Sequence, residues 1–316
     1  MHNLINYLWY KAPIIILIPL SPLSLVFFIL IFIRKYIFYR YFKRYTSKYK
    51  TIVVGNLTVG GSGKTPFTIW LSNFLESKNK KIAVISSGYG SSVSSPTKVT
   101  NSSLPQKVGD EAVLIHSKIN SIVVSGKNRV KSSIHCDQYD LDYIIHDDGL
   151  QHYSLNRDHQ LIIINNNFKG NNFVLPCGPY REPKFFHNKK DYIYSNYREN
   201  IYPGFYSKIT AFKSCNNQQS YNCNDKRFSD SILLTAIADD SIIIHELNEY
   251  NINVESHKYP DHYQYKSSDI PVTDKPILIS EKDYVKIKLL NCSNIYILEQ
   301  KIIPNDKLIE MIDNII

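Results

Sequence analysis

The stretch Gly55-Asn56-Leu57-Thr58-Val59-Gly60-Gly61-Ser62-Gly63-Lys64-Thr65-Pro66 decides the fold of this chain. It follows a β-type run at residues 51–54 and opens a helical pattern over residues 66–75. Glycines let backbone N–H groups turn toward phosphate oxygens, and a helix N-terminus adds partial positive charge. This order of strand, glycine loop, Gly-Lys-Thr and helix is typical of a phosphate-binding loop.

The loop predicts the binding of a nucleotide. Lys64 is expected to reach the β- and γ-phosphates, and Thr65 is expected to offer its hydroxyl to Mg²⁺. One departure is Thr58, which stands where the usual G-x4-G-K-T pattern has a glycine. The alternative interpretation is a flexible turn before a helix. The predicted nucleotide-binding residues are Gly60, Gly61, Ser62, Gly63, Lys64, Thr65 and Pro66.

The charge of the chain is concentrated at its N-terminus. The formal net charge is +9, but residues 1–50 hold eight of the 37 lysines and arginines and no acidic residue. The rest of the chain is nearly neutral, with 29 basic and 28 acidic residues. The basic excess therefore gives no indication of a nucleic-acid partner. The five cysteines include no C-x-x-C pair, which favours a reduced, cytosolic environment.

A second strong signal is the charge-free run at residues 12–33, which is long enough to cross a bilayer. Aromatic and basic residues flank it, and the basic residues behind it place the rest of the chain in the cytoplasm. No small-x-small cleavage site follows, which disfavours a cleaved signal peptide. Pro13, Pro19 and Pro22 interrupt a straight span. A spanning helix, a bent hairpin and a helix lying in one leaflet all remain open.

Beyond residue 50 the chain alternates β-type runs with helical stretches, which predicts an α/β fold with a mainly parallel sheet, like that of P-loop NTPases. A polar stretch near residues 216–226 suggests a domain boundary, and a shorter α/β set follows it. We expect a membrane anchor with a basic segment at residues 1–50, a nucleotide-binding domain at 51–220, and a smaller α/β domain at 221–316. Ten strands are expected, at residues 52–55, 82–86, 121–125, 141–146, 161–164, 192–195, 232–237, 252–257, 277–280 and 295–298.

An apolar run at residues 141–145 leads directly into His146-Asp147-Asp148-Gly149. A carboxylate at the carboxyl end of a parallel strand faces the phosphate loop and can hold Mg²⁺. Paired acidic residues also occur in solvated turns, which is the alternative interpretation. Beside a Gly-Lys-Thr loop, the pair predicts a magnesium site made by Thr65, Asp147 and Asp148.

Taken together, these motifs resemble the tetraacyldisaccharide 4′-kinase family, the lipid A 4′-kinases of Gram-negative bacteria. The resemblance runs nearly end to end, and the most discriminating combination is the phosphate loop at 54–66 with Asp-Asp-Gly-Leu-Gln-His at 147–152. Further matches lie at residues 19–21, 88–90, 109–111, 156–158, 175–183, 260–262 and 281–286. The chain departs from the family pattern at Ser87, where the family has arginine, at Tyr263, where it has histidine, and at residues 236–240.

The resemblance implies transfer of the γ-phosphate of ATP to the 4′-hydroxyl of a tetraacyldisaccharide 1-phosphate, a late step of lipid A biosynthesis. Phosphoryl transfer needs a cationic cradle, Mg²⁺, and a group that takes the proton of the attacking hydroxyl. The resemblance assigns this last role to Asp110 assisted by His262, with Lys64 as the third catalytic residue. Helix N-cap and structural histidine are the alternatives for Asp110 and His262. Further implied residues are Glu111 near the metal, and Gln151, His152, Arg129 and Arg181 for the substrate.

The resemblance also implies a location, the inner membrane with the catalytic domains on the cytoplasmic side. The expected partners are the glycolipid substrate and inner-membrane lipids, with no nucleic acid, and the sequence does not indicate the oligomeric state. A membrane anchor places the active site next to a lipid substrate and raises its effective concentration. Two rival functions stay open: a phosphotransferase for a small metabolite, and a membrane-tethered nucleotide switch.

Overall fold

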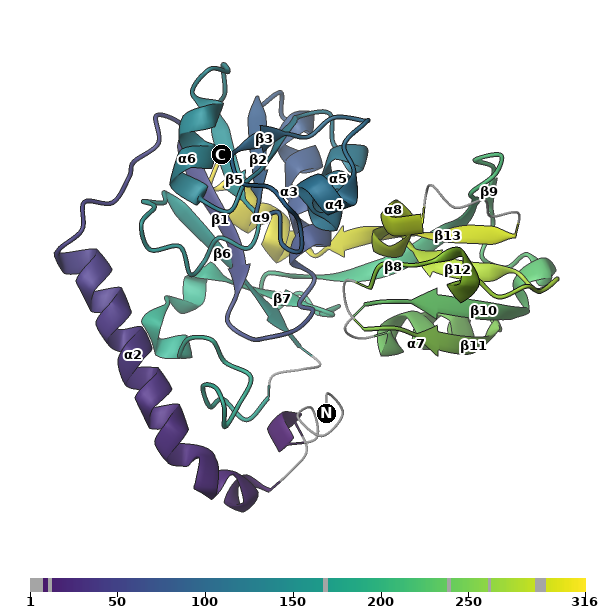
Figure 1. Cartoon of the computed structure of the whole chain (residues 1–316), viewed down its shortest axis with the longest axis horizontal. Helices are drawn as coiled ribbons and strands as arrows, with labels where there is room; N and C mark the ends of the chain where they lie inside the picture. The colour runs from purple at the N-terminus through teal and green to yellow at the C-terminus, as the bar shows by residue number, and fades with distance from the viewer. Residues whose placement is uncertain (1–7, 11–12, 167–169, 238–239, 261–262, 288–293) are drawn as a thin grey trace.

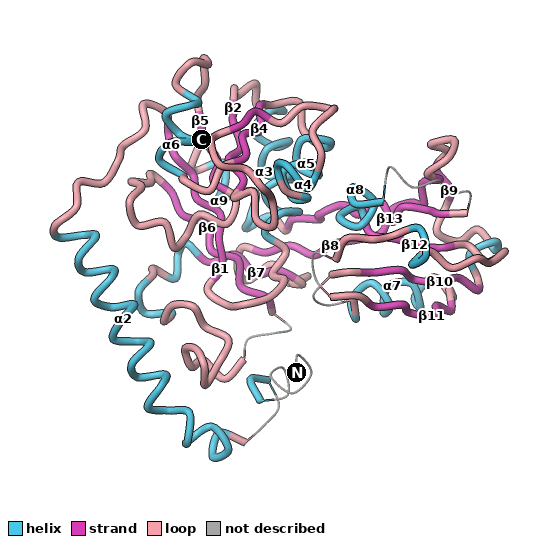
Figure 2. The backbone as a smooth tube through the Cα atoms, viewed as in Figure 1, coloured by secondary structure: helices cyan, strands magenta, loops and turns pink. Residues whose placement is uncertain are grey.

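The computed structural model describes residues 8–10, 13–166, 170–237, 240–260, 263–287 and 294–316. Its described strands form one sheet in the order β11-β10-β12-β13-β8-β7-β6-β1-β5-β2-β4-β3, and β9 pairs with β8. Figure 1 shows two lobes along this sheet, a larger one around β1 and a smaller one around β10. Figure 2 shows helices lying against the strands in both lobes, as expected for an α/β fold.

The larger lobe is built on parallel strands. β1 pairs in parallel with β5 and β6, β2 with β4 and β5, and β6 with β7, while β3 is antiparallel to β4. Its strands are β1 (Lys50–Asn56), β2 (Ile82–Ser86), β3 (Thr97–Lys98), β4 (Ile122–Ser125), β5 (Tyr143–His146), β6 (His159–Asn165) and β7 (Tyr192–Ser195). Its helices are α3 (Lys64–Ser77), α4 (Pro105–Val108), α5 (Asp110–Lys118), α6 (Arg129–Cys136) and α9 (Asp306–Asp313), with 3-10 turns at Lys184–Phe186 and Lys189–Asp191.

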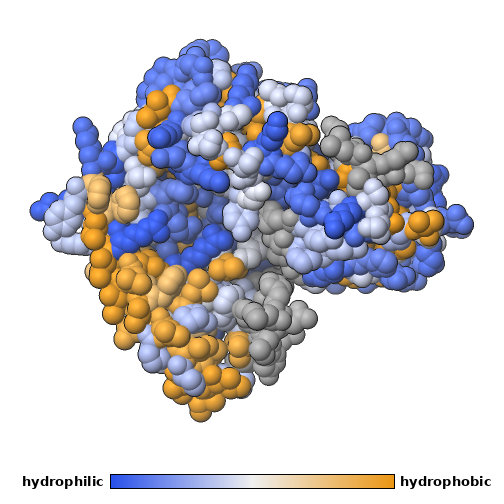
Figure 3. All heavy atoms as spheres, in the orientation of Figure 1, coloured by the Kyte–Doolittle hydropathy of each residue, from blue (hydrophilic) through white to orange (hydrophobic). Residues whose placement is uncertain are grey.

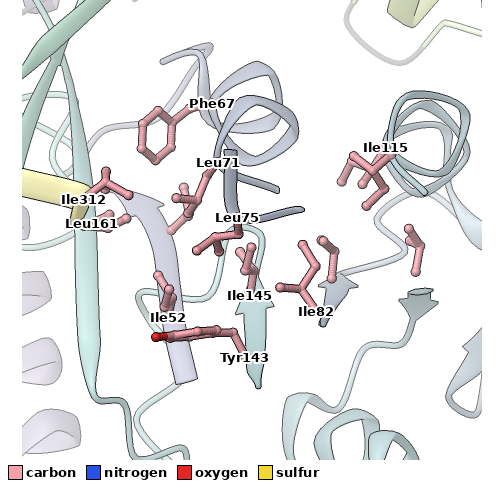
Figure 4. Packing of buried hydrophobic residues seen from close by; sticks show 14 of the residues in the cluster. Ile52, Phe67, Leu71, Leu75, Ile82, Ile115, Tyr143, Ile145, Leu161 and Ile312 are labelled. Carbon is pink, nitrogen blue, oxygen red and sulfur yellow. The ribbon is translucent and has the colours of Figure 1, made fainter. Parts of the chain in front are cut away.

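The core of the larger lobe lies between the sheet and helices α3, α5 and α9. Helix α3 presents Phe67, Leu71 and Leu75 to the strands, and all three are fully buried. Ile312 of α9 packs in the same cluster, as Figure 4 shows. This packing fixes α3, and therefore the loop that precedes it, against the end of β1.

The smaller lobe contains the remaining strands. β10 pairs in parallel with β11 and β12, and β12 pairs in parallel with β13. Its strands are β8 (Gly204–Ser214), β9 (Ser220–Tyr221), β10 (Asp230–Thr235), β11 (Asn253–Lys258), β12 (Ile277–Ser280) and β13 (Ile295–Pro304). Its helices are α7 (Ser241–Glu249) and α8 (Glu281–Ile287), with 3-10 turns at Lys226–Phe228 and Ser267–Asp269.

Two long strands join the lobes. β8 runs antiparallel to β13 along most of its length, and its first residues pair in parallel with β7. The chain thus enters the smaller lobe before residue 220, and α9 returns to the core of the larger lobe through Leu308 and Ile312. The domain boundary expected at residue 220 stays a proposal. Helix α9, at the C-terminus, follows the smaller lobe in the chain but packs in the larger one.

The N-terminal apolar run forms a 3-10 helix, η1 (Ile14–Leu20), followed by α2 (Ser21–Arg40). Pro19 lies inside η1 and Pro22 lies in the first turn of α2, where proline is tolerated, so neither proline interrupts α2. Among the described residues, Ile15–Arg40 is the one helical stretch long and apolar enough to cross a membrane. Figure 3 shows an apolar surface along this helix.

Candidate active site

The phosphate loop connects the end of β1 to the start of α3. Gly60 has φ 105° and Gly63 has φ 83°, which are backbone conformations that favour glycine. Gly63 is the residue before α3, and its carbonyl accepts the first helical hydrogen bond, from Phe67 N at 3.1 Å. The helix therefore begins at Lys64, two residues earlier than the sequence indicated, with Thr65 and Pro66 in its first turn.

Lys64 extends from the first turn of α3 back toward the end of β1. Its Nζ donates to Asn56 Oδ1 at 3.1 Å and lies 3.6 Å from Asp148 Oδ1. The side chain is 14% exposed. The ammonium thus lies between β1 and the turn that follows β5, in reach of the loop where phosphates would bind.

Asp147 lies at the end of β5, next to β1, as the sequence predicted. Its carboxylate accepts hydrogen bonds from Thr68 Oγ1 at 2.8 Å and Thr65 Oγ1 at 3.3 Å. Burial raises the pKa of Asp147, opposed by the hydrogen bond from Thr68 and by the charge of Lys64. Among the described residues, hydroxyl groups thus supply the close hydrogen bonds to this carboxylate.

Asp148 adopts a positive φ of 52°, which turns its side chain toward the loop. Its two oxygens face Lys64 and Arg181 Nη1, each at 3.6 Å. Burial acts to raise the pKa of Asp148, but the charges of Lys64, Arg181 and Arg129 outweigh it and hold the pKa below its usual value. Arg181, expected to bind substrate, is therefore at the edge of the phosphate site.

Arg129, one of the residues expected to bind substrate, begins α6 and is buried. It is 2% exposed, and its guanidinium donates to backbone carbonyls of Ile85 at 2.8 Å, of Asp148 at 3.3 Å, and of Asp147. These contacts tie the end of β2 to the turn that carries both aspartates. In this position Arg129 holds the turn that carries both aspartates, and its role toward the substrate stays a prediction.

Asp110 and Glu111 begin α5. Gly109 is the residue before the helix, so the alternative of Asp110 as N-cap is wrong; Asp110 is the first helical residue and accepts from Glu111 N at 2.9 Å. Asp110 is buried. Glu111 Oε1 lies 3.8 Å from Lys282 Nζ of the smaller lobe. Burial and the charge of Asp147 raise the pKa of Glu111 to about 7, opposed by Lys282.

Gln151 and His152 follow the aspartate pair. Gln151 Nε2 donates to the backbone carbonyl of Asn56 at 3.1 Å, and the Gln151 carbonyl accepts from Arg34 Nη2 of α2 at 3.3 Å. Burial, with the charge of Arg129, lowers the pKa of His152 to about 4, so His152 is neutral at pH 7. These contacts link the N-terminal helix to the strand before the phosphate loop.

His262 lies outside the described residues, and the pairing of His262 with Asp110 stays a prediction. Three other residues of the site were not predicted: Asn56, Thr68 and Lys282. Thr68 had a readable signal, because it follows Lys64 by four residues and so shares its face of the helix. Asn56 and Lys282 lie in segments that match the family pattern, but their partners depend on contacts that the local sequence does not encode.

The fold and this site define a phosphate-binding-loop protein of the α/β class. A family model described as Tetraacyldisaccharide-1-P 4'-kinase matches residues 16–316. A tetraacyldisaccharide 4'-kinase from Wigglesworthia glossinidia brevipalpis is 35% identical over 301 residues, covering 90% of this chain and 81% of the relative. One from Coxiella burnetii is 35% identical over 285 residues, covering 89% and 85%. A solved structure of LpxK from Aquifex aeolicus in complex with ATP has a TM-score of 0.77, with 24% identity and coverage of 94% of this chain and 98% of that one.

The chain therefore belongs to the tetraacyldisaccharide-1-phosphate 4'-kinase family. The family resemblance and the fold class expected from the sequence are confirmed. Membership of a kinase family makes the protein a phosphotransferase.

Proposed function

We propose that this protein transfers the γ-phosphate of ATP to the 4′-hydroxyl of a tetraacyldisaccharide 1-phosphate, in lipid A biosynthesis. The observation that carries the proposal is the gathering of Lys64, Thr65, Asp147 and Asp148 around one glycine loop, in a chain of this family. Lys64 supplies positive charge where the phosphates lie, and the loop N–H groups bind their oxygens. Ser62 supports this, because its buried hydroxyl has no hydrogen-bond partner among the described residues.

The residues present fit Mg²⁺. No group of three or more His, Cys, Asp or Glu side chains that could hold a metal occurs among the described residues. Magnesium in phosphotransferases is held by one or two carboxylates together with phosphates and water, and needs no such cage. Asp147 with Thr65 is the candidate ligand pair, with Asp148 and Glu111 as neighbours. When bound, Mg²⁺ would neutralise charge on the phosphates.

Asp110 is the proposed proton acceptor. As the oxygen of the sugar hydroxyl forms its bond to the γ-phosphorus, the bond from that phosphorus to the ADP oxygen breaks, and the hydroxyl proton moves to a base. Asp110 is buried at the start of α5, one residue before Glu111, whose pKa is raised by burial and by the charge of Asp147. We propose that His262 assists Asp110, and that Arg181, Gln151 and His152 contribute to substrate binding.

We propose that α2 lies in the cytoplasmic leaflet of the inner membrane and does not span it. Ser24 Oγ, near its start, donates to Val174 O at 2.7 Å and accepts from Cys177 N at 3.1 Å. Farther along, Lys35 Nζ donates to Phe186 O at 3.1 Å. A helix held along one side by its own protein leaves only the other side for lipid. Phe185, 74% exposed and beside Phe28, extends that apolar surface.

The proposal predicts a lipid-dependent reaction. Full-length protein in detergent, incubated with ATP, Mg²⁺ and tetraacyldisaccharide 1-phosphate, is expected to yield a glycolipid with the added mass of one phosphate. The same incubation with Lys64→Ala protein is the control. ADP formed at the same rate with and without the acceptor would support a nucleotide switch and overturn the kinase assignment.

A further inference from the structure

Asn56, the last residue of β1, is fully buried and contacts the lysine of the phosphate loop. Its Oδ1 accepts from Lys64 Nζ at 3.1 Å, and its Nδ2 donates to Thr58 O at 2.8 Å. From these contacts we infer that Asn56 is a positioning residue for phosphoryl transfer, which holds the Lys64 ammonium where the phosphates of ATP bind. The inference rests on the proposed kinase function and deepens it.

The orientation of the Asn56 amide is fixed by its neighbours. A carbonyl oxygen only accepts and an ammonium only donates, so Nδ2 must face Thr58 O and Oδ1 must face Lys64. Thr58 is itself held, because it bridges to Tyr180 and Val59 N donates to Pro179 O at 2.8 Å. The backbone carbonyl of Asn56 also accepts from Gln151 Nε2. Asn56 is therefore a rigid acceptor on a buried strand.

A rigid acceptor limits the conformations of the lysine side chain, which otherwise has many rotamers. Ordering such a side chain during binding lowers affinity, and holding it beforehand avoids that loss. An ammonium has three donors. One is directed to Asn56, and Asp148 Oδ1, at 3.6 Å, lies beyond hydrogen-bond distance. The ammonium retains donor capacity for phosphate oxygens while Asn56 holds it.

The neutrality of Asn56 is the second part of the inference. Asp148 already offers Lys64 a negative charge, and it shares that charge with Arg181. A second carboxylate beside the ammonium would offset the charge that attracts the triphosphate. An amide accepts the hydrogen bond and leaves the full positive charge available. This accounts for an asparagine at a buried position next to a lysine.

A double-mutant cycle tests whether Asn56 acts through Lys64. The variants are Asn56→Ala, Lys64→Ala and the double variant, all as full-length protein in detergent. In otherwise wild-type protein, Asn56→Ala is expected to reduce kcat/KM for ATP by about 10- to 100-fold, because a hydrogen bond to a charged group is lost. In the Lys64→Ala background, the same change is expected to have less than about a twofold effect, because groups acting as a unit are non-additive.

The matched control is Asn294→Ala in the smaller lobe, where the amide donates to the carbonyls of Asp274 and Lys275. It removes the same amide and is expected to lower stability while kcat/KM stays at the wild-type value. The affinity for ATP, measured by calorimetry on the same four proteins of the cycle, gives a second readout when turnover of Lys64→Ala protein is too slow to measure. If Asn56→Ala protein does not fold, Asn56→Ser, whose side chain is too short to reach the ammonium, replaces it.

The outcomes separate the two proposals. An equal loss from Asn56→Ala in both backgrounds would show that Asn56 only shapes the loop, and would overturn the inference alone. Absence of phosphate transfer by wild-type protein would overturn the proposed function, while the ATP affinities would still decide the role of Asn56.

Discussion

Replacing Arg129 by methionine tests whether this residue supports the two aspartates or contacts the substrate. The guanidinium donates to three backbone carbonyls, those of Ile85, Asp147 and Asp148, and is buried. Methionine fills much of the same space but donates no hydrogen bond. We therefore expect Arg129→Met to leave these carbonyls without their charged partner.

The expected loss of stability follows from those contacts. Leaving one buried acceptor unsatisfied costs about 1–3 kcal/mol. The Ile85 carbonyl keeps its hydrogen bond from Asp147 N at 3.0 Å, so the carbonyls of Asp147 and Asp148 are the two affected. Their sum is about 4 kcal/mol, which lowers Tm by roughly 8–16 °C. The displaced aspartates should also reduce kcat by roughly 100-fold, since small displacements of reacting groups have effects of that order. The KM for the glycolipid should change little.

The assay combines thermal unfolding followed by tryptophan fluorescence with steady-state kinetics on the same preparations. Arg129→Lys is the matched variant, because it keeps the charge and lacks the planar fork that reaches several carbonyls at once. It should fall between wild-type and Arg129→Met protein in both Tm and kcat. A stable Arg129→Met protein with normal kcat and a raised KM for the glycolipid would refute this reasoning and restore the substrate contact expected from the sequence.

Three other predictions follow from the site and the N-terminal helix. Protein lacking residues 1–40 should leave the membrane fraction yet bind ATP with unchanged affinity, measured by sedimentation and calorimetry; retention in the membrane would point to another apolar surface. Asp110→Ala and His262→Ala should each lower kcat strongly, and the double variant should lose far less than the product of the single losses; multiplicative losses would show independent roles. Asp147→Asn should shift the Mg²⁺ dependence of turnover to higher concentrations, and an unchanged magnesium titration would exclude Asp147 as a ligand.

The sequence predicted those parts of the fold that local patterns encode. All ten expected strands are present, and those at residues 82–86, 192–195 and 277–280 have the expected bounds. The strand that joins the lobes, β8 (Gly204–Ser214), was not predicted. Its buried residues do not alternate regularly with exposed ones, and its long partner β13 lies far along the chain. Strand pairing of that kind depends on tertiary contacts more than on intrinsic preference.

In the candidate site, too, some residues have a local sequence signature and others depend on tertiary contacts. Lys64, Thr65 and the aspartate pair were predictable because a loop, a helix start and a strand end each have a local signature. The positions of Arg129 and Asn56 were not, because each depends on which carbonyl or ammonium the fold brings to it. A buried arginine and an exposed substrate-binding arginine look alike in sequence, and burial alone separates them.

The contact between Glu111 and Lys282 joins the two lobes next to the proposed base. Glu111 begins α5 in the larger lobe, and Lys282 lies in the first turn of α8 in the smaller lobe. Lys118, at the other end of α5, pairs with Glu281 beside Lys282. Two ion pairs between the same two helices fix how α8 lies against α5. The carboxylate next to the proposed base therefore depends on the smaller lobe for a neighbouring charge, so the active site that we propose draws on both lobes although the phosphate loop belongs to one.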